Sequence, residues 1–172
     1  MQLAREIEQL SGQELSAPVF FQEFMTRVVT AVGARAGVIW LLDESGRLNL
    51  IAQMNLEHTG LRETPGALGV NEKLLIEVMQ TGEARTLTHG GEAKLPTEHV
   101  LVLSALHKEK KCVGVVELFQ RPDVPIKAQS GYMQFLEQMC GYASRYLEGR
   151  RRGLEDHADL KNQFWTDFEQ FS

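Results

Sequence analysis

The chain has 172 residues, of which 43% are hydrophobic and 24% charged, and its net charge is −5. This length suffices for one ordinary domain whose core needs no disulfide or metal, and the acidic balance argues against a dedicated nucleic-acid surface. The dense basic run Arg150–Arg152 is followed by Glu155 and Asp156, so we interpret it as a solvated helix face. No apolar run approaches the ~20 residues that span a bilayer, and the N-terminus lacks a signal-peptide core, so we expect a cytoplasmic protein.

Two helices are predicted before the first strand. The first, an amphipathic helix within residues 1–15, has apolar side chains on one face: Leu3, Ile7 and Leu10. The second begins after Ser16, carries Pro18 in its first turn and ends at Gly33.

A β-hairpin follows. Residues 38–42 are uniformly apolar and rich in β-formers, which predicts a central strand covered on both faces. Residues 44–46 supply the turn, and the alternation from Arg47 to Met54 is typical of a strand nearer the sheet edge.

The middle of the chain is predicted to be an insert of loops around a short helix. Residues 55–70 are rich in glycine and form a long loop, and a helix follows that is capped by Asn71 and ends at Gly82. A brief strand at 84–88 and a second loop at 89–97 complete the insert.

The pattern then repeats a hairpin and ends in a long helix. Two apolar runs are joined by the charged turn Lys108–Lys111, and a helix is predicted from Gln129 onward. Hairpin connections make the sheet antiparallel, so the sequence predicts an α+β fold with a central antiparallel sheet, helices on its faces and a long C-terminal helix.

Several segments resemble those of a GAF domain across residues 16–148: the strand GVIWLLD, the turn DESGRL, the helix end QTGEART and the strand KCVGVVELFQR. The resemblance implies terminal helices on one face of the sheet and, on the other, a small-molecule pocket formed with the insert at 55–97. An NKFDE-type motif and a cysteine at the bilin-attachment stretches are missing, so a cyclic nucleotide or a bilin is not expected, and the cofactor stays unidentified.

The two cysteines, Cys112 and Cys140, are far apart in sequence and form no CxxC motif, so neither a disulfide framework nor a zinc site is predicted. Since free methionine sulfoxide reductases share the GAF fold and use cysteines, a thiol-dependent reductase acting through Cys112 and Cys140 is retained as an alternative.

No metal site is predicted from the histidines. His99 and His107 would be about 26 Å apart along one strand, which is too far to bind one metal ion. His58 and His89 lie in the two loops that flank the expected pocket, where we interpret them as solvated.

Glu117 interrupts an apolar strand, where burial without a partner would cost several kcal/mol. Its partner is either structural, with Arg85 as one candidate, or a ligand in the pocket. Alternation leaves open which face of each strand lines the pocket. The candidate pocket residues are Met54, Leu75, Met79, Thr86, Val102, Ser104 and Glu117.

The terminal helices are predicted to form the seam of a homodimer through the following residues: Leu3, Ile7, Leu10, Leu136, Met139, Ala143 and Tyr146. Residues 149–172 are interpreted as a helical linker toward a further region of a multidomain protein. The aromatic residues Phe164, Trp165 and Phe168 repeat the order found in FFQEF at 20–24, which suggests a second GAF domain after Ser172.

These observations predict a non-catalytic sensory module of a signalling protein. It would bind a small molecule or a partner and relay its state through the terminal helices by population shift. The alternatives are a ligand-free dimerisation or spacer module and the thiol-dependent reductase.

Overall fold

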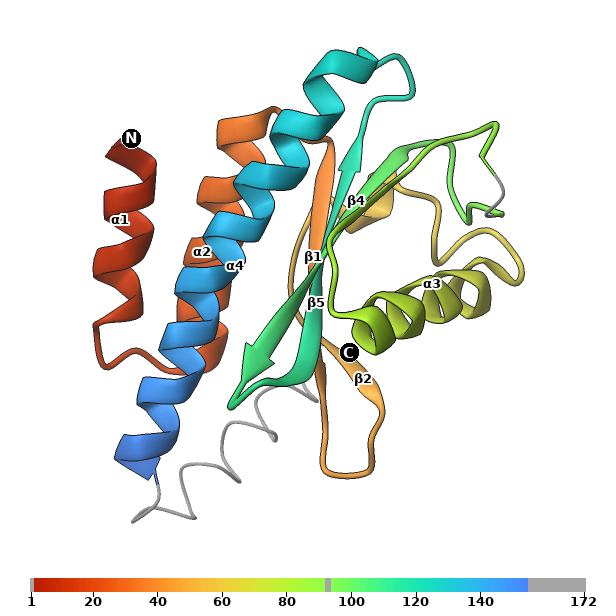
Figure 1. The fold of residues 1–172 in the computed structure, drawn as a ribbon. Coiled ribbons are helices and arrows are strands. Elements are labelled where there is room, and N and C mark those ends of the chain that lie inside the picture. The colour runs from red at the N-terminus through yellow and green to blue at the C-terminus, as the bar shows by residue number, and fades with distance from the viewer. Residues whose placement is uncertain (1, 92–93, 155–172) are drawn as a thin grey trace.

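The computed structural model describes residues 2–91 and 94–154 of the chain (Figure 1). In chain order, their helices and strands are α1 (Gln2–Ser11), α2 (Ala17–Val32), β1 (Ala36–Leu42), β2 (Leu48–Met54), the 3₁₀ helix η1 (Leu56–His58), α3 (Ala67–Thr81), β3 (Arg85–Leu87), β4 (Val100–Lys108), β5 (Lys111–Gln120) and α4 (Ile126–Leu154).

The described strands form one antiparallel sheet in the order β2-β1-β5-β4-β3. β1 pairs with both β2 and β5, while β2 lies at an edge, so the predicted central and edge positions are confirmed. β4 and β5 meet in a two-residue turn in which Glu109 and Lys110 have φ of 53° and 68°. Two positive φ angles are the mark of a type I′ hairpin, whose twist matches that of the strands.

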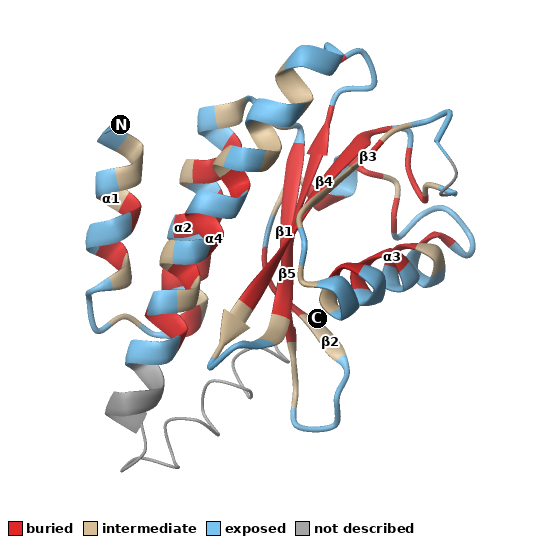
Figure 2. Cartoon of the chain, in the orientation of Figure 1, coloured by how far each residue is buried: buried red, intermediate tan, exposed pale blue. Residues whose placement is uncertain are grey.

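Helices cover both faces of the sheet, as predicted. α1, α2 and α4 lie on one face of the sheet, form a common core with it and are called the helical layer below. α3 and η1 cover the other face (Figures 1 and 2). β4 and β5 are therefore buried on both sides, and most of their side chains are inaccessible to solvent. The predicted α+β fold is confirmed.

The helical layer buries the residues that were predicted to form a dimer seam. The core on this face includes Ile7, Leu10, Leu136, Met139, Ala143 and Tyr146, and Leu3 packs against it. The Tyr146 ring stacks on Phe20 with 3.9 Å between ring centroids, and its hydroxyl donates to the carbonyl of Leu15. Helical periodicity predicted correctly that these faces are buried, but it cannot tell which chain covers them. The seam prediction is corrected, because the covering partner is the same subunit.

Two helix starts differ from the prediction. α3 begins at Ala67 behind Gly66, whose φ is 80°, and so Asn71 lies inside the helix instead of capping it. α4 begins at Ile126, just after Pro125, and not at Gln129. By contrast, α2 begins after Ser16 and ends at Gly33, where φ is 62°, as predicted.

α4 is described as far as Leu154. The aromatic segment around Phe164 and the suggested repeat lie in residues 155–172, outside the described part of the chain, and so does most of the predicted linker at 149–172. Across the described residues, none of the helices combines the length and apolar character needed to cross a membrane.

Candidate functional site

The sheet separates the predicted pocket residues into two groups. Leu75, Met79 and Glu117 lie on the face that α3 covers. Met54 and Val102 belong to the core under the helical layer, and Thr86 pairs with Val102 across β3 and β4, which puts it on the same face.

Ser104 also faces the helical layer, where it hydrogen-bonds Cys140 of α4. The prediction that all seven residues share one pocket is therefore corrected. Its physical reason is that β4 is buried on both faces, so that polarity gives no indication of which alternate residues point toward α3.

Glu117 is fully buried between α3 and the sheet. Its Oε1 accepts a hydrogen bond from Trp40 Nε1 in β1 and another from Asn71 Nδ2 in α3, both at 3.0 Å. Arg85, the structural partner considered from the sequence, instead pairs with Glu77 of α3 at 3.0 Å. Glu117, which lies in β5, is therefore hydrogen-bonded both to the neighbouring strand β1 and to α3.

Burial governs the protonation of this carboxyl group. Loss of solvent raises the pKa of Glu117 to about 7, although the hydrogen bonds from Asn71 and Trp40 act in the opposite direction. A buried carboxyl group without a cationic partner is stabilised in its neutral form.

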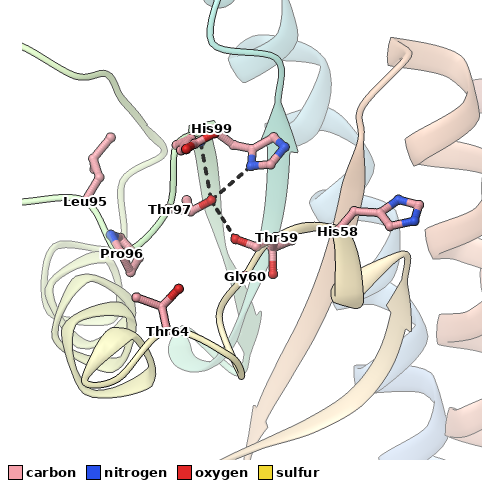
Figure 3. Close-up of a pocket in the computed structure, with 9 residues that line it drawn as sticks. His58, Thr59, Gly60, Thr64, Leu95, Pro96, Thr97 and His99 are labelled. Atoms are coloured by element: carbon pink, nitrogen blue, oxygen red, sulfur yellow. Dashed lines mark hydrogen bonds between the residues drawn. The ribbon is translucent and has the colours of Figure 1, made fainter.

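A cleft of about 440 Å³ opens beside this face, between the two loop segments of the insert. One wall comes from residues 58–64 and the other from residues 95–99 (Figure 3). The lining residues are His58, Thr59, Gly60, Thr64, Leu95, Pro96, Thr97, Glu98 and His99. None of the seven predicted pocket residues is among them, although His58 was expected beside the pocket and both loops were expected to flank it.

A hydrogen-bond network centred on Thr97 holds the two walls together. The Thr97 hydroxyl donates to the carbonyl of Thr59 at 2.9 Å, and its oxygen lies 2.9 Å from His99 Nδ1 (Figure 3). Because a hydroxyl has one proton, His99 must be the donor in the second bond, which places its proton on Nδ1. Burial, followed by the nearby Arg35, lowers the pKa of His99, in agreement with a neutral ring.

The two cysteines lie on opposite faces of the sheet. Cys112 is half-buried on the α3 side, with Sγ 3.3 Å from His107 Nε2, while Cys140 is buried in the core under the helical layer. Burial raises the pKa of Cys112 and raises that of Cys140 to about 12. Both thiols are thus held in their protonated, weakly nucleophilic form, and the sheet stands between them.

Within residues 2–91 and 94–154, no cluster of three or more histidine, cysteine or acidic side chains is arranged to hold a metal ion.

Solved structures with the same arrangement of elements come from several proteins. The GAF domain of a phosphoenolpyruvate-protein phosphotransferase from Acinetobacter is similar with a TM-score of 0.65 and 21% identity, covering 88% of this chain and 93% of that one. The GAF domain of a putative sensor histidine kinase from Pseudomonas syringae pv. tomato has a TM-score of 0.62 and 16% identity, covering 91% and 90%.

An enzyme is found among the similar structures as well. Free methionine-R-sulfoxide reductase from Neisseria meningitidis, solved with its substrate, has a TM-score of 0.64 and 12% identity, covering 87% of this chain and 89% of that one. Identities this low show a shared fold and leave the chemistry open. Among curated proteins, no significant match was found.

The sequence itself matches the family model described as "GAF domain" over residues 16–148. This span runs from the start of α2 to the last part of α4 and includes the whole sheet, the cleft and Glu117. With the family model and the fold in agreement, the chain belongs to the GAF domain family.

Proposed function

We propose that this chain is a non-catalytic regulatory GAF module of a larger cytoplasmic protein and that it binds a small molecule in the cleft between residues 58–64 and 95–99. The observation that carries the proposal is the cleft itself. Its volume of about 440 Å³ falls within the range of ~300–1,000 Å³ that is usual for small-molecule sites. Its walls offer threonine hydroxyls, a carboxylate and two imidazoles beside the apolar Leu95 and Pro96. This mixture suits a small polar ligand with a limited apolar surface.

β4 provides a physical connection from the cleft to the terminal helix. His99 lines the cleft immediately before β4 begins, and at the other end of the strand the His107 amide donates to Ser144 Oγ of α4 at 3.0 Å. Ser104, in the middle of β4, hydrogen-bonds Cys140 of the same helix. We propose that a ligand which favours one arrangement of the Thr97 network shifts the population of β4–α4 packings.

The arrangement of the thiols supports a non-catalytic role. A reductase that uses a nucleophilic and a resolving cysteine needs the two thiols to meet, and here the sheet lies between Cys112 and Cys140. Because reductases with the same fold exist, the fold alone does not decide whether this chain is an enzyme. We therefore propose the lack of reductase activity on the separation of the two thiols.

A thermal-shift panel of polar metabolites tests the ligand. At a ligand concentration of 100 times Kd, we expect a stabilisation of about 2.7 kcal/mol, which raises Tm by roughly 5–10 °C for a chain of this size. Thr97→Val should abolish this shift, because it removes the hydroxyl that joins the two walls. Thr26→Val, the same substitution at an exposed position of α2, should keep it.

A ligand-free spacer module is the second candidate, since the space between α3 and the sheet is filled by buried side chains, among them Leu74, Leu75 and Phe119. If no compound stabilises the wild type, the ligand-free spacer role is favoured over sensing. If a compound stabilises wild type and Thr97→Val equally, it binds without the Thr97 network, and the proposed cleft site is wrong. The residues expected at a dimer seam are buried within one subunit. Self-association through another surface stays a prediction, which analytical ultracentrifugation can test.

A further inference from the structure

Glu117, Asn71 and Trp40 form a buried polar cluster between α3 and the sheet, which we call the Glu117 cluster. The exposed fractions of Glu117 and Asn71 are 0% and 1%. Since Oε1 of Glu117 accepts both hydrogen bonds, Glu117 Oε2 and Asn71 Oδ1 are left as buried acceptors without a partner. Buried acceptors in folded proteins nearly always have a donor, so this cluster lacks one.

A single proton supplies a donor for both atoms. A carboxylic acid and a primary amide are complementary, because the acid carbonyl accepts from the amide N–H while the acid O–H donates to the amide carbonyl. The bond from Asn71 Nδ2 to Glu117 Oε1 is the first of these two bonds. We infer that Glu117 is the neutral acid in the folded protein, that its Oε2–H donates to Asn71 Oδ1, and that the docking of α3 onto the sheet depends on this proton.

No cation takes the place of this proton among the described residues packed around the cluster. The acceptor Oε2 has no partner, and the hydrogen bonds to Oε1 come from two neutral groups. Arg85 of β3 shares this face of the sheet, but its guanidinium pairs with Glu77. β1 contributes Trp40, and the residue opposite Glu117 in β4 is Leu103.

The remaining charged and titratable groups lie on the outer side of α3 or toward the ends of the face. On α3 the charged residues are Glu72, Lys73 and Glu77, and all three are exposed. Along the strands and η1 the charged or titratable residues other than Arg85 and Glu117 are Glu57, His58, His107, Lys108, Lys111 and Cys112, and His99 lies just before β4.

The sign of the pH dependence follows from the difference between the folded and unfolded chains. Burial raises the pKa of Glu117 to about 7 from its ordinary value of 4.5. Between these values the folded state holds the proton and the unfolded state has lost it, so stability falls as pH rises, by about tenfold in the unfolding constant per pH unit. Above pH 7 both states are ionised, and this dependence ends.

Ionisation of Glu117 should also affect the cleft, because α3 is bonded to one of its walls. The first amide of α3, at Ala67, donates to the carbonyl of Thr64 at 3.1 Å, and Thr64 lines the cleft. An α3 helix that loosens when Glu117 ionises therefore alters one wall of the cleft near neutral pH. This inference concerns the fold and holds whether or not a ligand binds there.

The direct test is the pH titration of the Glu117 side-chain carboxyl carbon by NMR in the intact chain, with Glu117→Gln used to assign the signal. We expect the neutral acid at pH 5.5 and a midpoint well above the ordinary glutamate value of 4.5. A Glu117 carboxyl that is already ionised at pH 5.5 would overturn the inference, and it would indicate a bound water or cation as the missing donor.

Denaturant unfolding between pH 5 and 7 gives an independent test. Glu117→Gln carries a permanent N–H donor in place of the acid O–H, so it should lack the pH-dependent loss. Its folding constant should therefore gain roughly 40-fold relative to that of the wild type between pH 5 and pH 7. Glu72→Gln, an exposed neighbour on the same helix, should follow the wild-type curve. Parallel curves for wild type and Glu117→Gln would contradict the proposal.

Discussion

Replacing Phe20 with alanine is expected to lower the free energy of unfolding by about 3–5 kcal/mol, the range measured for large aromatic truncations in cores. Phe20 is fully buried in α2. Its ring stacks on Tyr146 of α4 and meets the edge of Phe21 with 5.0 Å between centroids. Truncation therefore removes a contact between two helices as well as apolar burial. Denaturant unfolding followed by far-UV circular dichroism measures the change.

The same experiment shows which chain covers the helical layer. Because Phe20 and Tyr146 pack within one subunit, the loss of stability caused by Phe20→Ala should be the same at every protein concentration. The control is Val19→Ala, at the neighbouring position of α2, where the side chain is 49% exposed and alanine is the better helix former. A loss of less than 1 kcal/mol for Phe20→Ala, or a loss that changes strongly with protein concentration, would contradict the packing of Phe20 within one subunit.

Replacing Gly114 with alanine is expected to cost about 1–3 kcal/mol or more, as overpacking does in closely packed cores. A Cβ atom at this position would lie 2.2 Å from the carbonyl oxygen of Trp40 and 2.6 Å from Leu41 Cδ2. The first of these atoms belongs to the backbone of β1 and cannot rotate away. β1 and β5 must then separate at the point where Gly114 pairs with Leu41. Thermal and denaturant unfolding measure the cost.

Gly131→Ala is the matched control for this substitution. Gly131 lies in α4, is exposed, and a Cβ atom there would meet no neighbour within 4 Å. Alanine should raise stability by about 0.5–1 kcal/mol, since glycine is unfavourable inside a helix. If Gly114→Ala were as stable as Gly131→Ala, the close approach of β1 and β5 would be wrong.

The hairpins and the order of the elements could be predicted from the sequence because local signals determine them. The apolar run of β1 and the alternation of β2 placed one strand at the centre and the other at the edge. Gly33 ended α2 as predicted, since a glycine with positive φ is a strong local stop. The assignment of Asn71 as a helix cap also relied on a local signal, and it was wrong. Asparagine favours helix starts, but here its side chain is used in a tertiary contact with Glu117, which no local pattern can indicate.

The candidate site was harder to predict than the fold. Glu117 was recognised because a carboxyl group in an apolar strand needs a partner, yet its partners, Trp40 and Asn71, lie 77 and 46 positions away in sequence. The cleft lies between loops whose side chains carry no periodic pattern. The Thr97 network that joins them depends on a contact with Thr59, 38 positions away. The resemblance to GAF domains implied that these loops form a pocket, and only the fold shows which of their residues meet.

The central claim is that a ligand in the cleft changes how β4 packs on α4. Its most direct test is a ¹H–¹⁵N NMR titration of the intact chain with the compound that gives the largest Tm shift. We expect perturbed amides at 58–64 and 95–99 and also along β4 to His107 and Ser144, all of them lost in Thr97→Val. Perturbations confined to another surface, or confined to the cleft with β4 and α4 unchanged, would contradict the account.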